Sequence, residues 1–149
     1  MNPDFVEMLS ALRDAGADYL VVGAHALAAH GRPRATGDLA LWVRPTTDNA
    51  RRVYAALGAF GTPLRDLAVN ELVSPDVVFQ IGVAPARIDI LTSVSGVRFD
   101  EAWPDRLMVR IETLDVPVIG RDALIRNKRA AGRPRDLADV AELEAQPPG

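Results

Sequence analysis

The stretch YLVVGAHALAAHGRPRATGDLALWV, residues 19–43, carries the clearest structural pattern of the chain. Its first four residues are apolar and end at Gly23, which has no Cβ and therefore permits a sharp turn and the close approach of a ligand. Residues 24–30 have the composition of a helix, which Gly31 and Pro33 stop. The stretch predicts a buried strand, a glycine turn, a short helix and a second strand.

The second strand, residues 38–43, alternates with the period of two that is typical of strands. One of its faces carries Asp38, Ala40 and Trp42, and the other carries Leu39, Leu41 and Val43. The all-apolar face is expected to be core, so the carboxylate of Asp38 belongs to the opposite face. Trp42, like Trp103, is interpreted as a packing residue.

A second carboxylate, Asp89, stands in the apolar strand of residues 87–91. An ionised carboxylate on a mostly buried strand is costly unless a cation or hydrogen-bond donors compensate it. One interpretation is an ion pair with Arg87, two residues away on the same face. The other is that Asp38 and Asp89 meet across neighbouring strands and share Mg²⁺, which prefers carboxylates and phosphates. In that case Asp89 is expected to be the more buried of the two.

The glycine turn and Asp38 resemble the signature of the nucleotidyltransferase superfamily: an apolar residue, Gly, then Gly or Ser, nine to thirteen residues, and two carboxylates separated by one apolar residue. Here Gly23-Ala24 is followed by thirteen residues and then by Asp38-Leu39-Ala40. The resemblance is to small bacterial proteins related to minimal nucleotidyltransferases and AbiEii-type toxins. It extends to RIDILTSVSGVRFDEAW (87–103) and LIRNKRAAGRPRDLADVAEL (124–143).

This resemblance implies an α+β, polymerase-beta-like fold with a mixed, twisted sheet flanked by helices. The implied activity moves a nucleotide from a nucleoside triphosphate such as ATP to an RNA end, for example of a tRNA, or to a protein hydroxyl. Three carboxylates normally hold two Mg²⁺ ions, and the matching positions are Asp38, Ala40 and Asp89. A methyl group cannot bind a metal. The resemblance therefore implies a magnesium site weakened to Asp38 and Asp89, and an inactivated enzyme.

Two explanations of Ala40 remain open, an engineered Asp→Ala replacement and natural decay. Two alternatives to an impaired enzyme also remain. The first is a pseudoenzyme that binds nucleotide, and the second is a toxin–antitoxin module whose role is contact with a cognate antitoxin.

Five residues are candidates for nucleotide binding: Gly23, Ala24, Arg34, Thr36 and Lys128. Ala24 replaces the usual Gly or Ser with another small residue. Arg34 and Thr36 precede Asp38 and suit phosphate binding, although turn formation explains Thr36 equally well. Lys128, the only lysine, falls on the apolar stripe of its helix. It is expected either to pair with Asp38 or Asp89 in the interior or to contact the triphosphate.

Residues 121–135 contain six basic residues and one acidic residue. This run is either a solvated helix face or a phosphate-binding surface. Asp136 and Asp139 are expected to pair with Arg133 or Arg129. His25 and His30 flank the short helix with no partner at a catalytic spacing, so both are interpreted as packing or helix-end residues.

The composition places limits on the function. The 149 residues are 48% hydrophobic, which favours one ordered domain over residues 1–146 with a disordered tail at 147–149. The absence of cysteine excludes disulfides, thiolate zinc sites and cysteine nucleophiles. A net charge of −3 argues against a general nucleic-acid coat. No apolar run approaches a membrane span and the first residues lack a basic secretion signal, so a cytoplasmic protein without membrane contact is expected.

The remaining pattern predicts further helices and strands. Helices are expected after Asn2, after Thr46 and over 122–131 and 134–145, with a weak one within 64–73 and one turn at 99–103. Strands are expected over 77–81, 87–91, 106–111 and 116–119, the last two paired about a turn at Leu114-Asp115.

Overall fold

A six-stranded mixed sheet forms the centre of the molecule, in the strand order β3-β4-β2-β1-β6-β5. The computed structural model describes residues 1–32 and 37–145. The strands are β1 (Tyr19–Val22), β2 (Leu39–Val43), β3 (Val78–Ile81), β4 (Ile88–Leu91), β5 (Leu107–Ile111) and β6 (Leu114–Val118). β2 pairs with β4 and β1 with β6 in parallel, while the other three pairs are antiparallel. The predicted α+β architecture with a mixed sheet is confirmed.

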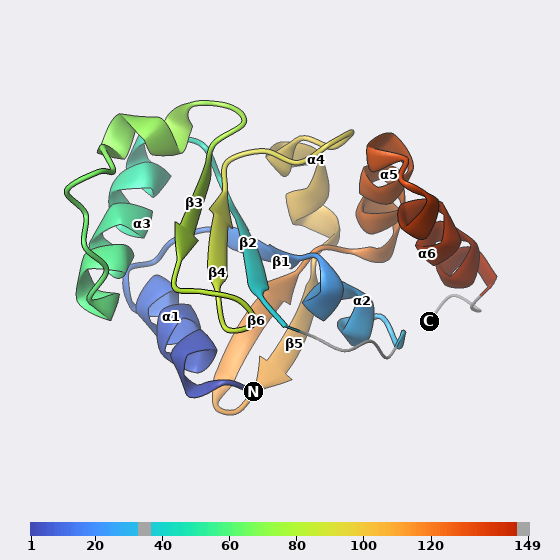
Figure 1. Ribbon diagram of the computed structural model, residues 1–149, viewed down its shortest axis with the longest axis horizontal. Coiled ribbons are helices and arrows are strands. Elements are labelled where there is room, and N and C mark those ends of the chain that lie inside the picture. The colour runs from blue at the N-terminus through green and yellow to red at the C-terminus, as the bar shows by residue number, and fades with distance from the viewer. Residues whose placement is uncertain (33–36, 146–149) are drawn as a thin grey trace.

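Helices cover both faces of this sheet. They are α1 (Pro3–Asp14), α2 (Ala24–Ala29), α3 (Thr47–Phe60), α4 (Phe99–Ala102), α5 (Arg121–Ala131) and α6 (Pro134–Ala145), with 3₁₀ turns η1 (Val69–Val73) and η2 (Trp103–Asp105). In Figure 1, α1 and α3 lie on one side of the strands, and α2, α4, α5 and α6 lie on the other. None of the helices in the described part of the chain is long and apolar enough to cross a membrane.

The helix ends follow from local chemistry. The side chain of Asn2 accepts a hydrogen bond from the backbone N–H of Asp4 and caps α1, and Thr46 caps α3 in the same way. α5 ends at Gly132, whose φ of 69° lies in the left-handed region. The predicted disordered tail at 147–149 lies outside the described residues.

One local prediction is wrong. The β5–β6 turn lies at Glu112-Thr113 and not at Leu114-Asp115, because Leu114 is buried and begins the core-facing pattern of β6. The helix predicted after Thr46 is α3, which Gly61 ends in the left-handed region with φ 99°. The weak helix predicted within 64–73 is the 3₁₀ turn η1, whose buried residue is Leu72.

The core lies on both sides of β1 and β2. All four residues of β1 are buried, and Trp42 on β2 is 1% exposed and meets Phe99 edge to face at 5.2 Å. Phe99 in turn stacks on Trp103 at 5.4 Å. The interpretation of both tryptophans as packing residues is confirmed.

Asn49 of α3 forms hydrogen bonds to the backbone just before β1 and just after β2. Its side chain is buried, accepts a hydrogen bond from the Asp18 N–H at 2.7 Å, and donates to the carbonyl oxygens of Asp18 at 2.9 Å and Arg44 at 3.0 Å. One amide thus satisfies three backbone groups that flank the two strands.

Replacing Asn49 with Ala is expected to lower the free energy of unfolding by about 1–3 kcal/mol, because three half-buried backbone groups lose the hydrogen bonds of a buried amide. Urea unfolding followed by circular dichroism measures the change. Asn70→Ala, at an exposed position of η1, is the matched control and should change stability by less than ~0.5 kcal/mol. An equal effect of the two substitutions would contradict this role of Asn49.

Candidate functional site

The parallel pairing of β2 with β4 brings the two predicted carboxylates together. Ala40 lies opposite Asp89 in the register, and Asp38 immediately precedes β2. Nη2 of Arg87 is 3.2 Å from Oδ2 of Asp38 and 3.3 Å from Oδ2 of Asp89. The two carboxylate oxygens are therefore closer to each other than the sum of these distances. The Asp89 side chain is 16% exposed and that of Asp38 25%, which confirms the expected order of burial.

Arg87 holds both carboxylates. Its Nε donates to Oδ1 of Asp89 at 2.8 Å, and its backbone N–H donates to Oδ1 of Asp38 at 3.0 Å. The hydrogen bond to Asp89 raises the pKa of the Arg87 guanidinium above its ordinary value. The predicted Arg87–Asp89 ion pair is confirmed. The contact of Arg87 with Asp38 was not predicted, since it depends on which strand lies beside β4.

The glycine turn lies directly beside Ala40. Val22 pairs with Ala40 across β1 and β2, and a Cβ added to Gly23 would lie 3.5 Å from the Cβ of Ala40. Gly23 has φ 73° and ψ −150°, a conformation that side chains disfavour. Ala24 begins α2 on the far side of the turn. The glycine turn, the methyl group of Ala40 and the two carboxylates therefore form one continuous surface.

Two magnesium ions do not fit the residues on this surface. Mg²⁺ requires close to octahedral oxygen coordination, and two neighbouring Mg²⁺ ions in a catalytic site share several carboxylates. Here Asp38 and Asp89 supply carboxylates, but the third position is the methyl group of Ala40 and Arg87 already engages both acids. Among the described residues, no group of three or more His, Cys, Asp or Glu side chains is placed to hold a metal.

Lys128 of α5 is buried between α5 and α6. Its Nζ lies 3.4 Å from Oδ1 of Asp136 and 3.1 Å from Oδ2 of Asp139, both buried carboxylates of α6. The expected pairing of Lys128 with Asp38 or Asp89 is therefore wrong. The chain reverses at Gly132, so α6 packs against α5 and its carboxylates lie beside the lysine. The burial inferred from its helical phase is confirmed.

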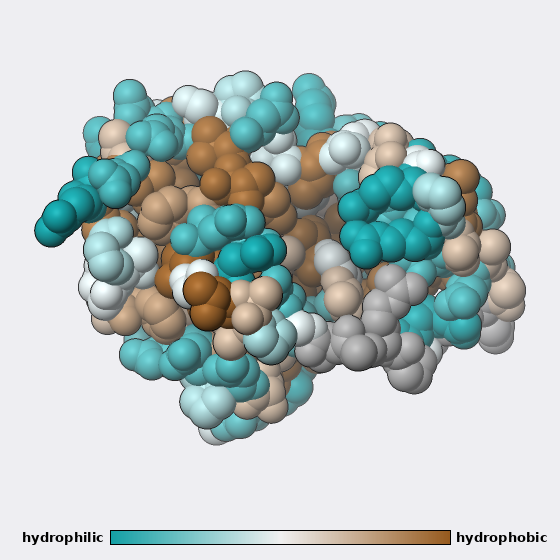
Figure 2. Space-filling model, in the orientation of Figure 1, coloured by the Kyte–Doolittle hydropathy of each residue, from teal (hydrophilic) through white to brown (hydrophobic). Residues whose placement is uncertain are grey.

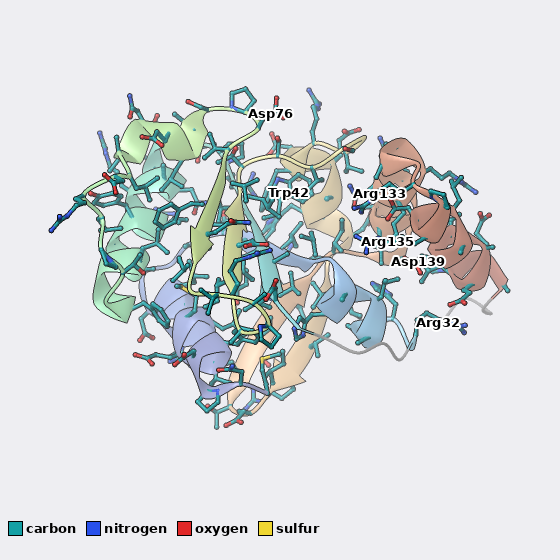
Figure 3. The ribbon with its side chains drawn as sticks, in the orientation of Figure 1. Arg32, Trp42, Asp76, Arg133, Arg135 and Asp139 are labelled. Carbon is teal, nitrogen blue, oxygen red and sulfur yellow. The ribbon has the colours of Figure 1, made fainter. Side chains whose placement is uncertain are left out.

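Asp136 also pairs with Arg133, as expected, with Nε 2.6 Å from Oδ2. This hydrogen bond and the charge of Lys128 hold the pKa of Asp136 below its ordinary value. Arg133, Arg135 and Asp139 lie on the side of the α5–α6 pair that faces the rest of the molecule (Figure 3). In Figure 2, hydrophilic side chains on this side border a hollow whose floor is hydrophobic.

Most of the basic run is neutralised within the protein. Ion pairs join Arg121 to Asp122, Arg126 to Glu101, Arg129 to Glu144 and Arg133 to Asp136. Arg129 thus pairs with Glu144 and not with an aspartate of α6. Arg135 has no ion pair with any described residue. This pattern favours the solvated-helix interpretation of the run over a phosphate-binding surface.

The remaining candidate residues are two in the segment before Asp38 and the two histidines. Arg34 and Thr36 lie outside the described residues. His30 ends α2, and its Nε2 is 2.8 Å from the carbonyl oxygen of Ile119. His25 meets Phe5 edge to face at 5.7 Å. Both histidines are packing residues, as interpreted.

Comparison with known proteins finds solved structures with a similar fold, among them the two that follow. No family model and no curated protein matches the chain. The lincosamide antibiotic adenylyltransferase LnuA, solved with lincomycin bound, has 10% sequence identity and a TM-score of 0.60, and the match covers 97% of each chain. A Thermotoga maritima protein described as a candidate nucleotidyltransferase has 13% identity and a TM-score of 0.57, over 97% of this chain and 91% of the other. The chain therefore has the nucleotidyltransferase fold.

Proposed function

We propose that the protein binds a nucleoside triphosphate beside the Gly23 turn and the Asp38–Asp89 pair, and that its chemistry is nucleotidyl transfer impaired by Ala40. The observation that carries this proposal is the register that places Ala40 opposite Asp89 and beside Gly23, with Asp38 at the strand end. The nucleotidyltransferase fold of the chain supports it. The proposed acceptor is an RNA end, such as that of a tRNA, or a protein hydroxyl.

In such a transfer an acceptor hydroxyl attacks the α-phosphate in line, the bond from that phosphorus to the leaving oxygen breaks, and pyrophosphate departs. Gly23 permits the backbone to approach the phosphates because it carries no Cβ. Asp38 and Asp89 repel phosphates, and Arg87 offsets part of that repulsion. The methyl group of Ala40 supplies neither a charge nor a base for the attacking hydroxyl. Deprotonation of the acceptor is therefore the step that this chain supports least.

A small-molecule hydroxyl is a second candidate acceptor. The basic run of α5 and the α5–α6 turn is largely paired with carboxylates of the same chain, which leaves few cations for an RNA backbone. LnuA, one of the structural neighbours, is described as a lincosamide antibiotic adenylyltransferase and was solved with lincomycin bound. A radiolabelled triphosphate offered with total RNA, lysate protein or a small-molecule extract distinguishes the three acceptor classes.

A nucleotide-binding pseudoenzyme is the alternative that the structure favours most, because Arg87 engages the acids that catalysis would need. An interaction module bound by a cognate antitoxin is the further alternative. Nucleotide binding separates these two, since only the pseudoenzyme requires it.

We expect Ala40→Asp to raise nucleotidyl transfer by about 100-fold or more, equivalent to ~3 kcal/mol of transition-state stabilisation. The reason is that it completes the three carboxylates that the superfamily resemblance implies. The measurement is transfer of label from α-labelled triphosphates with Mg²⁺ present. Ala40→Asn has nearly the same size without the charge and should stay silent.

Two results would count against this expectation. Equal activity of the Asp and Asn variants would show that the third carboxylate is not the missing group. Failure of both variants and of the unaltered chain to bind any triphosphate would remove the nucleotidyltransferase proposal and favour the interaction module.

Lys128 is the residue whose proposed phosphate contact is hardest to reconcile with its surroundings. Lys128→Met removes the cation from two buried carboxylates and should lower the free energy of unfolding by ~3 kcal/mol. If Lys128 also meets the β- and γ-phosphates, the folded variant loses more affinity for triphosphate than for monophosphate. Calorimetric titration with both nucleotides measures this, and Arg129→Met, which breaks an exposed pair on the same helix, is the control.

A further inference from the structure

We propose that Arg87 stands in for a metal ion at this site: it bridges Asp38 and Asp89, excludes divalent cations from them, and binds phosphate directly. The proposal extends the function proposed above to metal-independent binding and rests on it for the identity of the ligand, a polyphosphate such as the tail of a nucleoside triphosphate.

The first argument is that Arg87 occupies every carboxylate oxygen of the pair. Its backbone nitrogen is 3.0 Å from Oδ1 of Asp38, and Nη2 is 3.2 Å from Oδ2. On Asp89, Nε is 2.8 Å from Oδ1 and Nη2 is 3.3 Å from Oδ2. A divalent cation must displace these charge-assisted contacts before it can coordinate either acid.

The second argument concerns the donors that remain. A guanidinium carries five N–H groups in a rigid plane, and the contacts to Asp38 and Asp89 use those on Nε and Nη2. Nη1 has no partner among the described residues, and the side chain is 30% exposed. Two N–H groups are thus available to a phosphate oxygen, while the carboxylates fix the plane from which they project.

The third argument is the absence of a competing charge at position 40. Ala40 lies opposite Asp89 and adds no negative charge, so two acids share one guanidinium. A third carboxylate there would strengthen the attraction for a second, divalent cation. The missing carboxylate at Ala40 and the guanidinium of Arg87 therefore both disfavour a metal ion at this site.

The first experiment measures metal binding without any nucleotide. Free Mn²⁺ is titrated against the protein and followed by its electron paramagnetic resonance signal. Arg87→Gln keeps much of the aliphatic stem and loses the charge, so it is expected to bind Mn²⁺ at least tenfold more tightly than the unaltered chain. Arg110→Gln, which removes another strand arginine paired with one aspartate at 2.9 Å, is the matched control and should change nothing.

The second experiment measures inorganic tripolyphosphate binding by calorimetry in the presence of EDTA. The unaltered chain is expected to bind, Arg87→Gln to lose at least tenfold in affinity, and Arg87→Lys to fall between them because it keeps the charge without the planar bridge. Circular dichroism and urea unfolding verify that each variant is folded.

The proposal requires opposite changes in the two affinities. It is overturned if Arg87→Gln leaves Mn²⁺ binding unaltered, or if tripolyphosphate binds this variant as well as the unaltered chain without metal. If no version of the protein binds nucleotide, with or without Mg²⁺, the function proposed above is overturned instead. The Mn²⁺ titration still reports on Arg87 in that case, since it involves no nucleotide.

Discussion

The parallel hydrogen bonding of β2 to β4 is the constraint on which the site depends. Asp38 and Asp89 are fifty-one positions apart in sequence, and only this pairing places one beside the other. The same register sets Ala40 opposite Asp89 and gives Arg87, the residue before β4, access to both acids. A slip of one residue would turn Asp89 into the core, so burial of Ile88 and Ile90 also fixes the direction of the carboxylate.

Ion pairs within the chain explain why basic residues that are clustered in the sequence do not form an unpaired basic surface. The basic residues that follow Gly120 look like a phosphate-binding run, yet α6 and α4 supply carboxylates for most of them. Lys128 shows the same effect in the interior, where Asp136 and Asp139 satisfy it. Most cations of this run therefore already face carboxylates of the same chain, and Arg135 is the member of the run that has no ion pair with a described residue.

The two layers of helices explain why the candidate site is open on one face only. α1 and α3 cover the face that carries Leu39, Leu41 and Val43, all fully buried. The opposite face carries Ala40 and Asp89, which are partly exposed, and ends at Trp42 beneath Phe99. Apolar side chains thus cover one face of β2 and the Trp42 end of the other face. The carboxylate pair stays partly exposed beside the Gly23 turn.

By itself, the sequence determined the strand, glycine turn, helix and strand of residues 19–43, because these depend on local periodicity and on the backbone freedom of glycine. It also determined that Asp89 needs a cation and that Lys128 is buried, since both follow from the position of a charge on an apolar stripe. Only the tertiary structure decided which partners these charges have. Arg87 reaches Asp38 through the β2–β4 pairing, and Lys128 meets Asp136 and Asp139 through the α5–α6 reversal. Long-range pairing is set by packing of the whole core, and no local pattern encodes it.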